Sequence, residues 1–200
     1  LMGFNNSQTE LFFKAISNKH IKEFKSSTSQ IIQFGISTGD VITRIAKEKH
    51  CKVIGYDYSP VALASLKEEK EVETRLVNLN AIEKNKLLYQ EQLQIDFERI
   101  SDVLFIRVLE YLNPEAAKLL IISTINLAKP GSRFYFEVDS PPEDLITPAG
   151  IHVAYALKPG TISSLFAKRS DVQVEVLTNK RNDNDQGPNT IERLLIKKIG

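Results

Sequence analysis

Short apolar runs alternate along the chain with segments whose apolar residues recur at helical spacing. The apolar runs predict strands at residues 31–34, 53–56, 76–79, 102–106 and 134–138. The segments between them predict helices at residues 40–49, 59–73 and 113–128, the last two each beginning with a capping residue followed by proline. Because strands and helices alternate, we expect a mostly parallel sheet that is covered by helices on both faces.

The pattern changes towards both ends of the chain. Residues 11–24 fit a broken amphipathic helix, which we interpret as part of an N-terminal lid over residues 1–30 or as packing at the sheet edge. Residues 162–168 predict a short helix, residues 172–177 alternate strictly, and residues 191–199 are extended again. The expected fold is therefore an α/β, Rossmann-like, doubly wound sheet that ends in an antiparallel β-hairpin. We expect one domain over residues 1–200, with its core at 31–138 and an acceptor-side loop and hairpin at 139–200.

Composition and charge exclude several kinds of partner and site. The chain has 200 residues and a formal net charge of +1, so no long-range field attracts nucleic acid or an anionic membrane. The single cysteine, Cys51, excludes an internal disulfide and a cysteine-based zinc site, and its apolar neighbours predict that it is buried. No apolar run approaches a membrane span of about 20 residues, and the first residues lack the features of a signal peptide. We expect a cytoplasmic protein without a metal site.

The candidate chemistry follows the predicted strands, because ligands of such sheets bind at the carboxyl ends of the strands. Gly35 and Gly39 frame a loop that leads into a helix, and Asp57 comes 22 residues after Gly35, close to the spacing of about 20 for a ribose-binding acid. Asn80 and Ala81 follow the third predicted strand and suit contact with a base. Each of these residues alone is also typical of an ordinary turn. Together they favour a nucleoside site.

The glycine spacing narrows the class of ligand that the loop can bind. A nicotinamide fingerprint needs a middle glycine where this chain has Ser37, and a last glycine where it has Asp40. The Gly-Lys-Ser/Thr element of a phosphate-binding loop is missing from this segment. The loop therefore favours a nucleoside without phosphates.

At this point the motifs resemble those of class I S-adenosylmethionine-dependent methyltransferases. The resemblance covers residues 31–138 and extends in topology to the final hairpin, and it rests on these segments: QFGISTG, VIGYDYSPVALASL, VNLNAI, DVLFIRVLEYLNPE and LAKPGSRFYFEV. It implies S-adenosyl-L-methionine as cofactor and methyl transfer by in-line displacement. Asp57 would bind the ribose, Asn80 the adenine, and Gln33 stands where an acidic residue often lies near the methionine amine. The other cofactor contacts that the resemblance implies are Gly35, Ser37, Gly39, Tyr58, Ala81 and Arg107.

On the acceptor side we single out Arg107, His152 and Tyr155. Arg107 ends an apolar strand and either pairs with Glu110 or contacts the cofactor or an acidic acceptor. His152, a candidate general base, and Tyr155 lie in the loop after the fifth strand, where loops commonly cover an acceptor. Without a basic stripe or an added domain, we expect a small-molecule acceptor and no nucleic-acid partner.

Two alternatives remain open from the sequence. One is a non-catalytic module that binds S-adenosylmethionine or a protein partner and retains the fold. The other is a nicotinamide-dependent oxidoreductase, which predicts a sixth parallel strand.

Overall fold

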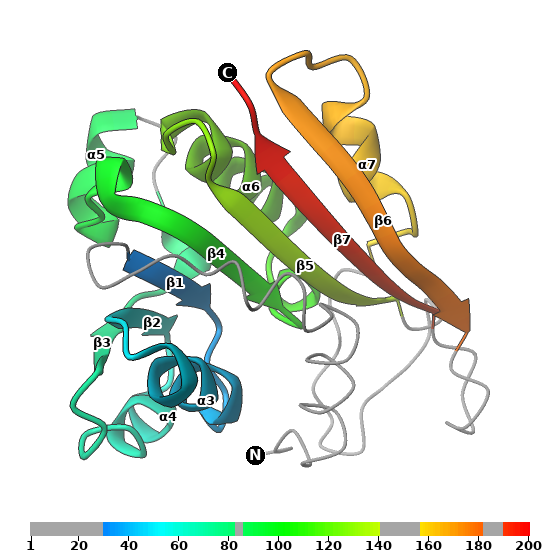
Figure 1. Ribbon diagram of the computed structural model, residues 1–200. Helices are drawn as coiled ribbons and strands as arrows, with labels where there is room; N and C mark the ends of the chain where they lie inside the picture. Colours follow the sequence, from blue (N-terminus) through cyan, green and yellow to red (C-terminus); the bar gives the residue numbers. More distant parts are fainter. Residues whose placement is uncertain (1–29, 83–85, 141–156, 182–189) are drawn as a thin grey trace.

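The computed structural model describes residues 30–82, 86–140, 157–181 and 190–200. They form one seven-stranded sheet in the order β3-β2-β1-β4-β5-β7-β6 (Figure 1). The first five strands in this order are parallel, and β7 runs antiparallel to both β5 and β6. The strands are β1 (Gln30–Phe34), β2 (Val53–Asp57), β3 (Val72–Leu76), β4 (Ile100–Ile106), β5 (Arg133–Ser140), β6 (Val172–Arg181) and β7 (Thr190–Lys198). The predicted fold class is confirmed, and the antiparallel last pair contradicts the sixth parallel strand of the oxidoreductase alternative.

Helices cover both faces of the sheet, and we name the faces after them. The α3 face packs against α3 and α4, while the α6 face packs against α5, α6 and α7. The helices are α3 (Asp40–Lys49), α4 (Pro60–Ala64), α5 (Lys86–Leu93), α6 (Pro114–Leu127) and α7 (Thr161–Phe166), with 3-10 turns η1 (Leu79–Ala81), η2 (Phe97–Arg99) and η3 (Leu109–Tyr111). None of the described helices is long and apolar enough to span a membrane.

Local sequence explains where two of these helices begin. The Ser59 hydroxyl accepts the backbone N–H of Ala62, and the Asn113 side chain accepts that of Ala116, each just before a proline in the first turn. Both starts confirm the predicted cap-and-proline pattern.

The two faces of the sheet differ in polarity. Phe34, Phe105 and Phe136 stack in a row on the α6 face, with centroids 5.2 and 4.8 Å apart. The α3 face is apolar next to α3, where Cys51 is buried as predicted. The same face also buries polar and charged side chains, among them Gln33. Because buried polar groups are costly unless they are paired, their placement needs a reason.

Two predictions about the middle of the chain are wrong. The third strand spans Val72–Leu76 and not residues 76–79, so Asn80 lies in η1 and not at a strand end. Residues 67–73 are not the end of a helix, because α4 stops at Ala64. The edge strand β3 is only partly buried, and it can therefore carry charges such as Glu73 and Arg75. The helix α5 was missed, and the predicted helix at 11–24 lies outside the described residues.

Arg75 is the polar link between β3 and the segment that follows α5. Its Nη1 donates to the carbonyl oxygens of Leu93 and Gln94, at 2.8 and 2.5 Å, and to the Tyr56 hydroxyl at 3.0 Å. The guanidinium also lies 5.7 Å from the centroid of the Tyr56 ring. Burial raises the pKa of Tyr56 to about 12, although Arg75 acts in the opposite direction. Tyr56 therefore stays neutral and donates to the Leu93 carbonyl at 2.7 Å.

We expect Arg75→Met to lower the free energy of unfolding by about 1–3 kcal/mol, because it leaves two carbonyl groups without their charged donor. Urea denaturation followed by circular dichroism measures the change. Arg44→Met is the control, since Arg44 forms a helical surface pair with Glu48 and should cost less than about 1 kcal/mol. Equal losses in the two variants would contradict a special role for Arg75.

Candidate functional site

The glycine loop joins β1 to α3 in a conformation that its sequence permits. Gly35, Ser37 and Gly39 have φ angles of 70°, 49° and 82°, all in the left-handed region. The Gly35 N–H donates to the Tyr56 carbonyl, and the Gly39 N–H donates to the Ile36 carbonyl, both at 2.8 Å. Two of the three left-handed positions are glycines, where the conformation is not strained. The loop therefore leads the chain from the carboxyl end of β1 directly into the start of α3.

Asp57, the predicted ribose-binding residue, contacts this loop directly. Its Oδ2 accepts the backbone N–H groups of Ile36 and Ser37, at 2.9 and 3.3 Å, and its Oδ1 accepts that of Ser59 at 2.9 Å. The side chain is nearly buried at the carboxyl end of β2. Since two carboxylate oxygens offer about four acceptor sites, Asp57 retains capacity for a ligand hydroxyl. Asp57 therefore fixes the glycine loop, and like that loop it lies at the carboxyl end of the parallel strands.

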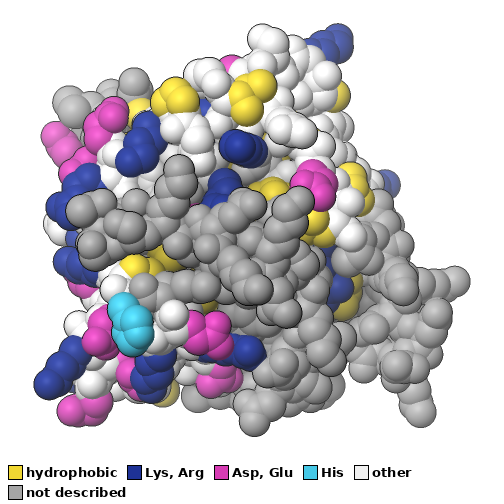
Figure 2. All heavy atoms as spheres, viewed as in Figure 1, with side chains coloured by type: hydrophobic (Ala, Val, Ile, Leu, Met, Phe, Trp, Pro, Cys, Tyr) yellow, Lys and Arg dark blue, Asp and Glu magenta, His cyan; other side chains and the backbone are white. Residues whose placement is uncertain are grey.

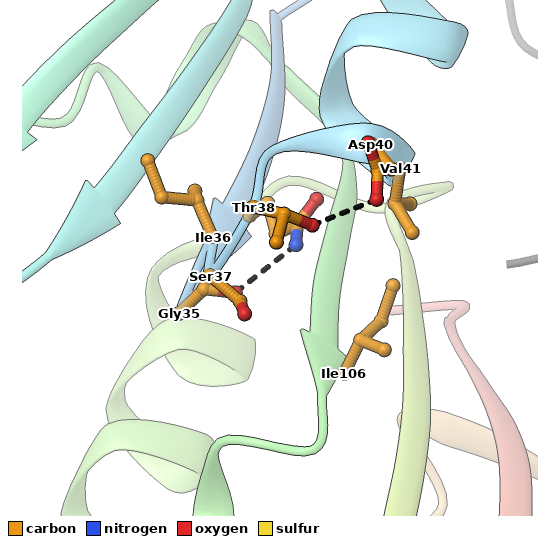
Figure 3. Close-up of a pocket in the computed structure, with 8 residues that line it drawn as sticks. Gly35, Ile36, Ser37, Thr38, Asp40, Val41 and Ile106 are labelled. Atoms are coloured by element: carbon orange, nitrogen blue, oxygen red, sulfur yellow. Dashed lines mark hydrogen bonds between the residues drawn. The ribbon is translucent and has the colours of Figure 1, made fainter. Parts of the chain in front are cut away.

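A small pocket with a cavity volume of about 10 Å³ opens beside the glycine loop. Figure 3 shows Ile106, at the end of β4, across the pocket from Val41 on α3, while Thr38 donates to Asp40 at 2.7 Å. The volume is about the space of one water-sized group and is far below the roughly 300–1,000 Å³ of pockets that enclose a whole drug-sized ligand. The pocket therefore has room for one small polar group of a ligand whose other parts lie outside it. Its lining residues are Gln33, Gly35, Ile36, Ser37, Thr38, Asp40, Val41 and Ile106.

Gln33 is the buried polar residue of this pocket. Its Nε2 donates to the Gly35 carbonyl at 3.0 Å, which fixes the orientation of the amide because that carbonyl can only accept. The other end of the amide, Oε1, is buried and has no hydrogen-bond partner within the part of the chain that the structure describes. Such an acceptor is costly unless a donor meets it. Asp40 is the ionisable residue that lines the pocket. The Gln33 and Asp40 side chains together therefore favour a ligand that donates hydrogen bonds.

Three of the predicted cofactor contacts, the proposed base contacts Asn80 and Ala81 among them, are not part of the pocket lining. Asn80 and Ala81 are exposed in η1, and Tyr58 is exposed after β2. The Asn80 Oδ1 accepts the backbone N–H of Asn113 at 2.8 Å and its Nδ2 at 3.1 Å. Asn80 therefore links η1 to the start of α6. Its role in binding a base stays a prediction.

The predicted acceptor-side residues are described only in part. Arg107 follows β4 with a φ angle of 49°, and its backbone N–H donates to the Glu137 carbonyl at 2.8 Å. His152 and Tyr155 lie outside the described residues. Within those residues, no group of three or more His, Cys, Asp or Glu side chains is arranged to hold a metal ion.

Sequence reasoning missed the walls of the pocket. Thr38, Val41 and Ile106 line it, but helical and strand periodicity assigns the last two to the core. The sequence argument uses Asp40 only as a departure from the nicotinamide fingerprint, and the structure places it at the pocket as the first residue of α3. Their position in the sequence could have identified these residues, because residues next to a glycine loop at the end of a strand commonly line the ligand site there.

No protein-family model matches the sequence, and the search of curated proteins found no match. Solved structures do match. The plantazolicin methyltransferase BamL, solved with S-adenosylhomocysteine, superposes with a TM-score of 0.68 at 13% identity, over 96% of this chain and 85% of BamL. The [4+2]-cyclase SpnF gives 0.67 at 12% identity, over 99% and 83% of the two chains. An rRNA methylase from Streptococcus thermophilus gives 0.61 at 12% identity, over 90% and 92%.

These similarities define the class to which the fold belongs. The chain has the fold of class I S-adenosylmethionine-dependent methyltransferases, as the resemblance of its motifs implies. Because the matched proteins act on different substrates and one is a cyclase, the fold leaves the reaction to be argued from the site.

Proposed function

We propose that this protein binds S-adenosylmethionine and transfers its methyl group to a small molecule. The single observation that carries the proposal is the buried Oε1 of the pocket-lining residue Gln33, which has no hydrogen-bond partner among the described residues. The α-ammonium group of the methionine part is such a donor. Asp40 lines the same pocket and supplies a negative charge for it, and the pocket has room for one group of about this size.

The remaining residues of the site have complementary roles in this proposal. When bound, the cofactor supplies a methyl group on a positively charged sulfur. Asp57 would accept hydrogen bonds from the ribose while it holds the Ile36 and Ser37 N–H groups in place. Ile106 provides an apolar wall of the pocket, and orientation of the reactants supplies much of the rate enhancement in such displacements.

Surface charge supports a small acceptor. On the face shown in Figure 2, the basic and acidic side chains of the described residues are interspersed. Neither sign forms a continuous field there of the kind that nucleic-acid binding requires. With the formal charge of +1, this favours an acceptor that is recognised by local contacts.

Gln33 variants test the proposed ammonium contact. We expect Gln33→Leu to weaken binding of S-adenosylhomocysteine by about 10-fold, and Gln33→Glu to strengthen it several-fold, because a carboxylate attracts the ammonium more strongly than an amide does. Isothermal titration calorimetry measures both changes. The matched ligand is 5′-methylthioadenosine, which lacks the amino-acid part and should bind all three proteins alike. If Gln33→Leu binds S-adenosylhomocysteine as tightly as the wild type does, the unpaired Gln33 Oε1 does not take part in cofactor binding.

The second candidate function is a non-catalytic binding module. One observation favours it, because both carboxylate oxygens of Asp57 already accept backbone N–H groups. Under this alternative S-adenosylmethionine binds only weakly, and labelled methyl groups reach no acceptor in a broad small-molecule screen. Transfer of the labelled methyl group to any compound in the screen would contradict the non-catalytic alternative.

A further inference from the structure

A second buried polar feature lies next to the pocket and has no role in the proposed cofactor contacts. Arg193 Nε and Glu137 Oε2 are 2.7 Å apart, on neighbouring strands β7 and β5. The Glu137 side chain is 3% exposed, while that of Arg193 retains 14%. Buried ion pairs contribute little to stability because desolvation of the charges offsets their attraction. The position of such a pair in the fold therefore decides whether it has a further role.

The register of the sheet places this pair beside the pocket. Ile106, which lines the pocket, is directly opposite Glu137, and Glu137 is directly opposite Arg193. Residues that are opposite one another point to the same face of a sheet, here the α3 face. Neighbouring strands are about 4.8 Å apart, so the carboxylate is one strand from the pocket wall and the guanidinium is two strands away. Within the pair, the carboxylate is therefore on the strand nearer to the pocket wall.

We propose that the Glu137 carboxylate, held by Arg193, is the acceptor-side subsite and that it takes an amine. This inference rests on the proposed methyl transfer. Before transfer the amine gives up a proton to water. Its nitrogen lone pair then forms a bond to the methyl carbon, the carbon–sulfur bond breaks with its electron pair on sulfur, and the positive charge passes from sulfur to nitrogen. A carboxylate next to the nitrogen stabilises that charge as it develops. Arg193 is a positioning residue, because it acts through Glu137.

The chain carries its own control for this pair. Arg133 Nε and Asp102 Oδ1 are also 2.7 Å apart, with side chains 11% and 0% exposed. This second pair lies on the same face but joins β4 to β5 near the amino ends of these strands, away from the pocket. Burial raises the pKa of Asp102, although Arg133 opposes the shift. The two pairs share chemistry and burial and differ in position.

Three small probes with the same ring distinguish the charge that the subsite prefers: benzylamine, benzoate and benzyl alcohol. Each is titrated by calorimetry into the protein with saturating S-adenosylhomocysteine and again without it. We expect benzylamine, which is cationic at neutral pH, to bind at least about 10-fold more tightly than the other two. Binding of S-adenosylhomocysteine itself is measured first, so that a failure of the proposed function is seen separately from a failure of the amine subsite.

Charge-neutralising variants then locate the binding. We expect Glu137→Gln to lose benzylamine binding by about 10-fold or more, and Asp102→Asn to keep it. Because a single change leaves Arg193 with a weaker partner, the double variant Glu137→Gln/Arg193→Gln is made as well, and it should lose the amine while it binds S-adenosylhomocysteine normally. Three results overturn the proposal: no benzylamine binding by the wild type, preference for benzoate, or amine binding that is unchanged in folded Glu137 variants.

Discussion

Asp57→Ala is expected to weaken the binding of S-adenosylmethionine by about 10- to 100-fold. The change removes the acceptor for a ribose hydroxyl, and one charge-assisted hydrogen bond corresponds to about 1.5–3 kcal/mol, or roughly one to two factors of ten. It also frees the N–H groups of Ile36, Ser37 and Ser59 from the carboxylate. We therefore expect a stability loss of about 2–4 kcal/mol in the same variant.

Calorimetry and urea denaturation separate the two effects. Asp57→Asn keeps an acceptor oxygen and should fall between the wild type and the alanine variant in both measurements. Asp96→Ala is the control, because the Asp96 carboxylate also accepts a backbone N–H, that of Glu98 at 3.2 Å, but in an exposed turn. A folded Asp57→Ala protein with unchanged affinity for S-adenosylmethionine would refute the assignment of Asp57 to the cofactor site.

Gly39→Ala is expected to cost about 2–5 kcal/mol of the free energy of unfolding. Its φ angle of 82° disfavours any residue with a Cβ, which accounts for about 1–2 kcal/mol. A Cβ at this position also overlaps the Leu66 side chain, lying 2.9 Å from Cγ, and Leu66 is buried. The overlap forces the start of α3 away from the core, and overpacking of this kind typically costs a further 1–3 kcal/mol or so.

Gly131 provides the matched control for that prediction. Its φ angle of 89° is just as unfavourable for alanine, but a Cβ there meets nothing within 4 Å. Gly131→Ala should therefore show only the conformational cost of about 1–2 kcal/mol. Adding Leu66→Ala to Gly39→Ala should cost less than the sum of the single changes, because the smaller side chain removes the overlap. Equal costs for Gly39→Ala and Gly131→Ala in urea denaturation would rule out the steric part of the argument.

Residues with strong local signals were predicted well. The buried strands around Phe34, Val53 and Phe105, and the capped start of α6 at Asn113, follow from apolar runs and from cap-and-proline chemistry. The edge strand β3 was misplaced because its charged residues alternate on a partly exposed strand, where side-chain periodicity no longer distinguishes a strand from a solvated helix end.

The site was predictable in outline but not in its contacts. The spacing of Gly35 and Asp57 identified the two loops, and the structure joins them through the Asp57 carboxylate. The pairing of Glu137 with Arg193 depends on which residues are opposite one another across β5 and β7, and a single sequence does not define that register. Single charges in predicted strands are ordinarily assigned to solvent, and their burial here comes from tertiary structure.

The central position of β1 has a consequence for the order in which the protein folds. Ile31 pairs with Val53 on one side and with Asp102 on the other, so the first contact closes a short loop and the second a long one. Long loops close more slowly, and contacts between distant residues dominate folding times. During refolding, the contact between Asp57 and the glycine loop should therefore form before Ile106 arrives to complete the pocket. The capacity to bind the cofactor's amino-acid end would then be among the last properties that the chain acquires.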